Sequence, residues 1–343
     1  MSEKKENFFK RELAYNTHIK NNLLDIRNDI ENCNSSEDII NTFESYKDEK
    51  NLVYKNKIFY ISLLIALVIG SIGLYIAFLS KDFGLPSIIL SVIAFIFLII
   101  GTIYKKTDDE RQSLISFIED KYLEGKYKFQ IMAQQEDLSH EKITNAYQHL
   151  FKKGNYSNDI PYFVSGSLTH NQKPLPYTVF KYHFVDKRTE TYRENGKNKK
   201  RVVYDHFDNW GIFISNIECA SFSITNYRNK HFSNTWTTSS IDFDRRHSIS
   251  GSNEMELAKL FQPANVLMFE KLLSKHPTFE LTCNSAIPTV CWNFDWDVLK
   301  RVNSNANNCI SSKQFSGHLA NLHMPAYEQL LKNLNPLLDK MVH

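Results

Sequence analysis

Two long stretches without a charged residue dominate this sequence. Ile58–Ser80 contains 23 consecutive uncharged residues and Leu85–Tyr104 contains 20. At a rise of about 1.5 Å per residue, a helix over either stretch can cross a hydrocarbon core of roughly 30 Å. Two buried helices of a soluble protein are the alternative, but both stretches lack the polar stripe of such helices. The sequence therefore predicts a transmembrane hairpin. Neither span contains Asp, Glu, Lys, Arg or His, which favours an anchor over an ion path.

Positive charges flank this hairpin unequally. The loop between the spans has one cation, Lys81, whereas seven lie near the outer ends: Lys47, Lys50, Lys55, Lys57, Lys105, Lys106 and Arg111. An excess of Lys and Arg marks cytoplasmic flanks, so we expect both termini in the cytoplasm. The first apolar stretch starts at residue 58, too far along the chain for a secretory signal peptide. We therefore expect the hairpin to be retained.

Small residues recur on one face of each span. In the first span they are Ser62, Ala66, Gly70, Gly73 and Ala77, and in the second Ser87, Ser91, Ala94 and Gly101. Small residues let two helix backbones approach closely within a bilayer. The pattern favours packing of the two spans on each other, and a dimerisation face is the alternative.

The region before the hairpin is predicted to be helical. Apolar residues recur every three or four positions between residues 6 and 56, with a break at Asn34–Ser36 and a new helix start at Ser36. Such apolar stripes need a partner. The partner is either residues 107–124 of the same chain, or a second copy or other protein bound through these helices.

The sequence changes character after about residue 135. Phe180, Tyr182 and Phe184 alternate with polar residues, as in a half-buried strand, and Glu194–Lys197 predicts a turn. Further strands are expected at Arg201–Asp208, Gly211–Asn216, Ala220–Thr225, Thr237–Ile249, Phe279–Asn284 and Thr289–Phe294, and helices at Glu141–Lys152 and Glu254–Ser274. Grouped strands with segregated helices predict an α+β domain with a largely antiparallel sheet.

These patterns divide the chain into five expected parts. They are a cytoplasmic helical region at 1–57, the hairpin at 58–104, a juxtamembrane helix and linker at 105–134, the α+β domain at 135–300, and a polar linker with a C-terminal helix at 301–343.

Charge and cysteine content exclude some partners. The net charge of +3 is too small for a protein whose main partner is nucleic acid. Five irregularly spaced cysteines do not form a disulfide framework, which favours a reducing compartment. Cys283, Cys291 and His276 could meet at a metal, although ordinary buried thiols are the favoured interpretation.

Motifs of enzyme chemistry are missing. The sequence has no phosphate-binding loop, no His-Glu-x-x-His helix and no Gly-x-Ser-x-Gly elbow. We accordingly expect no catalytic, cofactor-binding or metal-binding residues. The most distinctive segment is Asp242–Arg246, in which Arg245 and Arg246 could clamp an anion. The favoured alternative is a strand whose charged residues pair with neighbours while Phe243 and Ile249 enter the core.

Part of the chain resembles a known family. Gly211, Ile212, Phe213 and Ile214, followed by Phe243–Ile249 and by Leu260 with Pro263, are similar to the bacterial membrane-protein family of the domain of unknown function DUF3137. The resemblance covers about residues 55–300 and includes the layout of helical start, two-helix hairpin and mixed domain. It departs from the family at His247 and Leu257, where Phe and Ala are usual. The resemblance implies a bacterial inner-membrane protein, and it gives structural roles to Gly211, Phe213, Phe243, Arg245, Arg246, Ile249 and Pro263.

Basic residues gather around the predicted turn at Glu194–Lys197. They are Lys187, Arg188, Arg193, Lys197, Lys199, Lys200 and Arg201, against two nearby glutamates. Such a run is often a solvated loop. In a domain tethered near a bilayer, however, anionic lipids attract basic segments. We therefore predict a contact with anionic lipid, or failing that with an acidic protein, through Lys197, Lys199, Lys200 and Arg201.

Together these observations favour a membrane-anchored cytoplasmic module that binds or scaffolds a partner. A membrane-associated hydrolase or transferase with an unrecognised site is the alternative. A deep pocket with converging titratable groups would favour the enzyme, and an exposed apolar groove would favour the binding module.

Overall fold

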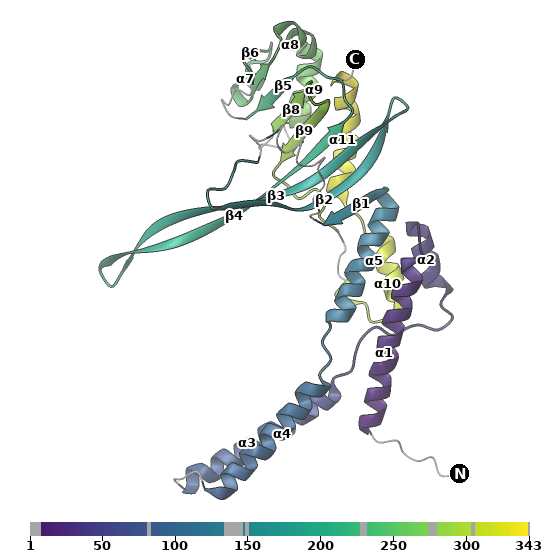
Figure 1. The fold of residues 1–343 in the computed structure, drawn as a ribbon, viewed down its shortest axis with the longest axis vertical. Helices are drawn as coiled ribbons and strands as arrows, with labels where there is room; N and C mark the ends of the chain where they lie inside the picture. The colour runs from purple at the N-terminus through teal and green to yellow at the C-terminus, as the bar shows by residue number, and fades with distance from the viewer. Residues whose placement is uncertain are drawn as a thin grey trace. The chain divides into compact units, whose positions relative to one another are not determined.

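The computed structural model describes residues 8–80, 84–133, 147, 151–226, 232–273, 280–302 and 306–341. The fold is mixed α+β with an antiparallel sheet, which confirms the predicted class (Figure 1). The chain forms two compact units. Unit 1 is Met1–Lys126 with Asn303–Leu322, and unit 2 is Tyr127–Val302 with His323–His343. The sequence-based boundaries differ, because residues 301–343 do not form a separate tail but are divided between the units.

Unit 1 is helical. Its elements are α1 (Phe8–Glu31), α2 (Ser36–Ser45), α3 (Lys57–Ser80), α4 (Leu85–Tyr104), α5 (Asp109–Tyr127), a short 3-10 helix at Ala306–Asn308, and α10 (Ser312–Asn321). The predicted start of α2 is confirmed, since the Ser35 hydroxyl accepts from the Asp38 backbone N–H at 3.0 Å and completes a capping box. The prediction of helix up to residue 56 is wrong. Residues 46–56 are not helical, because Leu52 pairs its backbone N–H with the Ile310 carbonyl instead.

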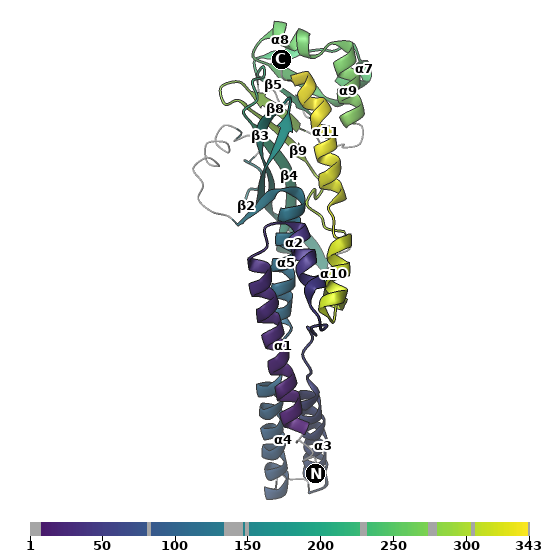
Figure 2. The same cartoon turned by 90° about the vertical axis from the view of Figure 1, so that its right-hand side faces the viewer.

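The two apolar helices α3 and α4 lie side by side (Figure 2). Ser62, Ala66, Ser87 and Ala94 are buried between them, and a Cβ added at Gly73 would lie 3.3 Å from the Leu90 Cβ. The small-residue faces therefore pack within the hairpin, which is the favoured interpretation of the sequence. Large apolar side chains cover the outside of both helices and are exposed. Both helices are long and apolar enough to cross a membrane.

The apolar stripe of α1 packs within its own chain. Ile19, Ile26 and Ile30 are buried, and the Arg27 guanidinium lies 5.0 Å from the ring centroid of Phe117 in α5. This contact agrees with residues 107–124, the first of the two partners that the sequence left open. A second partner, α10, was not expected: its Phe315 ring packs 5.6 Å from that of Phe43 in α2.

Unit 2 is built on one antiparallel sheet with the order β1-β2-β3-β4-β9-β8-β5-β7-β6. Its strands are β1 (Phe129–Ala133), β2 (Ser157–His170), β3 (Lys173–Glu194), β4 (Lys197–Ser215), β5 (Phe222–Thr225), β6 (Asn234–Trp236), β7 (Ser248–Gly251), β8 (Glu280–Asn284) and β9 (Thr289–Phe294). Its helices are α7 (Ile241–Arg246), α8 (Glu254–Leu260), α9 (Pro263–Leu273) and α11 (Pro325–Met341).

Two predicted elements of unit 2 differ from the structure. The expected strand Thr237–Ile249 is instead the helix α7 followed by β7. The expected helix Glu254–Ser274 is two helices, because α9 restarts at Pro263, whose ring suits a first helical position. The helix predicted at Glu141–Lys152 lies largely outside the described residues.

Aromatic side chains fill the core on one side of the sheet. The rings of Phe180 and Phe213 stack 4.7 Å apart, and the buried Tyr147 hydroxyl donates to the Thr289 carbonyl at 2.6 Å. Gly211 allows this packing, since the Phe180 ring occupies the space that a Cβ would need. Helix α11 is joined to β3 by a hydrogen bond between the Tyr177 and Tyr327 hydroxyls.

Candidate functional site

Strands β3 and β4 continue beyond the rest of the sheet as a two-stranded ribbon (Figure 1). Strand β2 pairs with β3 only as far as Val185, and β9 pairs with β4 only from Trp210 onward. Asp186–Glu194 and Lys197–Asp205 therefore pair only with each other over roughly 30 Å, at about 3.3 Å per residue. We call this segment the ribbon. It closes in a turn at Asn195 and Gly196, whose φ angles of 50° and 77° are those of a tight hairpin.

The register divides the ribbon into two faces of different charge. Residues directly opposite each other share a face, and successive residues alternate between faces. The acid-bearing face holds Asp186, Arg188, Glu190, Tyr192, Glu194, Lys197, Lys199, Arg201, Val203 and Asp205. The carboxylate-free face holds Lys187, Thr189, Thr191, Arg193, Asn198, Lys200, Val202 and Tyr204.

Cations on the acid-bearing face are largely neutralised. Arg201 Nη2 lies 2.7 Å from Glu190 Oε2, and Lys199 Nζ lies 2.6 Å from Glu194 Oε2. Arg188 Nε contacts Asp205 Oδ2 at 2.5 Å. The hydrogen bond and charge of Arg201 hold the pKa of the Glu190 carboxyl below its ordinary value. This face therefore carries matched ion pairs.

The other face combines positive charge with exposed apolar surface. The Lys187 ammonium lies 5.6 Å from the ring centroid of Tyr156 and 6.0 Å from that of Tyr204. Val202 is 51% exposed and Tyr204 44%. Within the described residues, Arg193 and Lys200 have no carboxylate within ion-pair distance. The carboxylate-free face thus offers three cations beside valine and tyrosine.

The four residues predicted to contact lipid do not lie together. Lys197, Lys199 and Arg201 are on the acid-bearing face, and only Lys200 is on the carboxylate-free face. Sequence reasoning found the basic cluster but left Lys187 and Arg193 out of the predicted lipid contact. The alternation of side chains along each strand could be read from the sequence. To decide which residues of β3 share a face with which residues of β4, however, the register across the turn is needed.

A chain of hydrogen bonds between titratable groups lies nearer the base of the ribbon. His206 Nδ1 is 3.3 Å from His183 Nε2, and His183 Nδ1 is 2.8 Å from Asp208 Oδ1. A hydrolase could use such a chain to orient an imidazole. The side chains of His183 and Asp208 are 30% and 44% exposed, however, so water competes for them on this open face.

The residues of the family resemblance lie in unit 2. Phe213 and Phe243 are buried, as is Ile249, and Pro263 opens α9. Arg245 and Arg246 belong to α7 and line a cavity of about 430 Å³ together with Asp244. Arg245 Nη1 lies 3.8 Å from Asp242 Oδ1 at the surface, and Arg246 Nε donates to the Asp242 carbonyl at 3.1 Å. Both arginines thus contact a neighbouring residue, as the favoured alternative to an anion clamp predicted. They lie on a helix, however, and not on the predicted strand.

For the cysteines, the favoured interpretation as ordinary buried thiols is contradicted at Cys283, and the sheet register contradicts the less favoured metal arrangement. Cys219 and Cys283 form a disulfide, with Cα atoms 6.6 Å apart, although 64 residues separate them. Cys283 pairs with Val290 across the β8–β9 hairpin while Cys291 pairs with Thr282, so Cys283 and Cys291 point to opposite faces of the sheet. The suggested metal geometry is therefore wrong. His276 lies outside the described residues.

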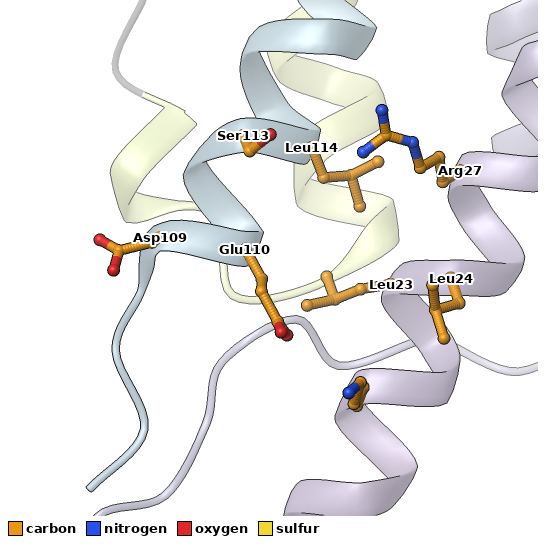
Figure 3. Close-up of a pocket in the computed structure, with 8 residues that line it drawn as sticks. Leu23, Leu24, Arg27, Asp109, Glu110, Ser113 and Leu114 are labelled. Carbon is orange, nitrogen blue, oxygen red and sulfur yellow. The ribbon is translucent and has the colours of Figure 1, made fainter.

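Unit 1 has a groove of about 400 Å³ between α1 and α5 (Figure 3). Leu23 and Leu24 of α1 and Leu114 of α5 line it with apolar side chains, and Arg27 and Glu110 line it with charged ones.

Comparisons with family models, curated proteins and solved structures find no match to this chain. The resemblance to DUF3137 therefore stays a prediction.

Proposed function

We propose that this chain is an integral protein of the bacterial inner membrane, anchored by α3 and α4, with both termini in the cytoplasm. In this proposal unit 2 is a binding module held at the membrane surface. The exposed apolar side chains of α3 and α4 support the anchor, because water would be a poor solvent for them. The cations around Lys55 and Lys105 support the orientation.

The single observation behind the binding role is the segregation of charge on the ribbon. Anionic lipids attract juxtamembrane cations by about 1 kcal/mol per Lys or Arg close to the surface. Lys187, Arg193 and Lys200 lie on the face without carboxylates, so no ion pair on that face offsets the attraction. Val202 and Tyr204 add apolar and amphipathic side chains suited to a lipid interface. We propose that this face binds anionic lipid and sets the tilt of unit 2 on its anchor.

Hydrogen exchange of the full chain in lipid nanodiscs tests this proposal. In discs that contain phosphatidylglycerol, we expect the ribbon amides to exchange several-fold more slowly than in phosphatidylcholine discs. High salt should remove the difference, because it screens exposed charges.

The two faces provide a matched pair of variants. Lys187→Gln, Arg193→Gln and Lys200→Gln together should abolish the protection. Lys197→Gln, Lys199→Gln and Arg201→Gln remove the same charge from the acid-bearing face and should leave most of the protection. Equal protection by neutral lipid, or equal losses in the two triple variants, would contradict the proposal.

A further inference from the structure

A group of hydrogen bonds fixes α1 to the chain segment that leads into α3. The Asn16 side chain donates to the Lys55 carbonyl at 2.8 Å and accepts from the Lys55 backbone N–H at 2.9 Å. Glu12 Oε1 accepts from the backbone N–H of Ile58, in the first turn of α3, at 3.1 Å. The Asn56 side chain joins this segment to Lys106 through bonds of 3.0 and 2.8 Å. Both chain segments that enter the hairpin are thus held beside α1.

A cavity of about 320 Å³ lies beside these hydrogen bonds and is lined in part by Asn16. We call it the neck pocket. Lys20, Lys105 and Lys106 line it, and Glu110 is its single carboxylate. Glu110 already accepts a hydrogen bond from the Tyr54 hydroxyl at 2.7 Å. Within the described residues, no carboxylate lies within ion-pair distance of the three lysines. The neck pocket therefore has an excess of two positive charges.

The neck pocket lies where the apolar helices end. Lys105 directly follows the last residue of α4, and its ammonium is 5.3 Å from the ring centroid of Phe59 in the first turn of α3. In a bilayer crossed by α3 and α4, this level is the headgroup region that borders the hydrocarbon core. Phosphate groups of lipids lie at that level.

Exposed apolar side chains continue from the pocket toward the N-terminal end of α1. Leu13 lines the pocket and is 39% exposed, and Phe8 and Phe9 are each 43% exposed. Phe8 precedes Glu12 by one helical turn, about 6 Å along the axis. It lies on the same stripe as the buried Ile19 and Ile26, yet no described residue covers it fully. A lipid chain would cover it.

We propose that the neck pocket binds the phosphate of an anionic phospholipid, with the lipid's acyl chain along Leu13, Phe9 and Phe8. The three lysines supply the positive charge for a phosphate, and their excess over Glu110 selects an anionic headgroup over a zwitterionic one. This inference rests on the proposed membrane anchor.

Native mass spectrometry of the full chain in detergent tests the inference by counting bound lipid. We expect phosphatidylglycerol to bind at least tenfold more tightly than phosphatidylcholine, and inorganic phosphate alone not to compete. Lys20→Gln with Lys106→Gln should weaken phosphatidylglycerol binding by about tenfold or more. Lys47→Gln with Lys313→Gln removes the same charge from exposed positions of unit 1 outside the pocket and should leave binding unchanged.

Equal weakening in both double variants, equal binding of the two lipids, or displacement by inorganic phosphate would overturn the proposal. Carbonate extraction of the same chain from cell membranes separates it from the anchor proposal. A chain that resists extraction but binds lipid without this selectivity refutes only the neck pocket, whereas a chain that is extracted refutes the anchor as well.

Discussion

Phe243 shows how one buried ring supports a short helix. It is the fully buried residue of α7, a helix of six residues, and its neighbour Ile241 is 77% exposed. Phe243→Ala removes a large buried side chain and leaves a cavity, so we expect a loss of about 3–5 kcal/mol in the free energy of unfolding. Ile241→Ala in the same helix should change it by less than about 0.5 kcal/mol. Denaturant unfolding of the full chain in detergent measures both. Similar small effects would mean that the Phe243 ring is not part of the core.

His247 should make the stability of unit 2 depend on pH. The pKa of its imidazole is lowered from 6.5 to about 4, mainly by burial; the charge of Arg246 contributes to the lowering, and the charge of Glu270 opposes it. The unfolded chain therefore binds more protons than the folded chain between these two values. The stability that His247 contributes is present above pH 6.5 and is lost as the pH falls toward 4.

The variant His247→Phe should remove this part of the pH dependence. Its ring can keep the contact with Phe243, whose centroid is 4.8 Å from that of His247. Thermal melting of the variant and the unchanged chain from pH 7 to pH 4 provides the measurement. Parallel melting curves at every pH would show that His247 is not held neutral by the fold.

At the scale of elements, local patterns predicted what local interactions determine. The β3–β4 hairpin follows from alternating aromatics and the Asn195-Gly196 turn, both of which act within a few residues. The prediction of a strand at Thr237–Ile249 was wrong because Ile241 and Phe243 alternate with charged residues, a pattern that is also typical of strands. The competing signal was the Ser240 hydroxyl, which accepts from the Phe243 backbone N–H at 3.3 Å and starts α7.

Long-range pairing explains the remaining errors. Helix α10 packs on α2 and its His318 contacts Glu119 Oε1 at 2.8 Å, across almost 200 residues. The disulfide between Cys219 and Cys283 likewise joins distant segments. At the candidate site, the basic cluster was visible in the sequence, whereas its division into two faces depends on the pairing of Thr191 with Lys200.

At the scale of the whole molecule, orientation in the membrane decides which compartment surrounds unit 2. The positively charged residues that flank the hairpin predict that unit 2 is cytoplasmic. The disulfide between Cys219 and Cys283 favours the opposite side, because disulfides persist mainly in oxidising compartments. We expect reporters fused before Met1 and after His343 to be cytoplasmic, and a tag at Asp82 to be accessible from outside the membrane. In a reducing cytoplasm we expect the Cys219–Cys283 disulfide of the structure to be reduced, so that both thiols react with thiol reagents when protein from cells is unfolded without added reductant. A periplasmic C-terminus together with unreactive cysteines would show that the orientation is opposite to the proposed one.

The path of the chain has a consequence for biosynthesis. Unit 1 begins with α1 but needs α10, whose N-cap residue Ser311 bridges to Asn51 and whose Phe315 packs on Phe43. The second apolar helix leaves the ribosome roughly 200 residues before α10 does, which corresponds to about 10–40 s at 5–20 residues per second. During that interval the hairpin can already insert, while the apolar face of α2 still lacks the helix that will cover it. Nascent chains would therefore expose Phe43 at the membrane until α10 has been synthesised, and a chaperone acting there would meet this surface first.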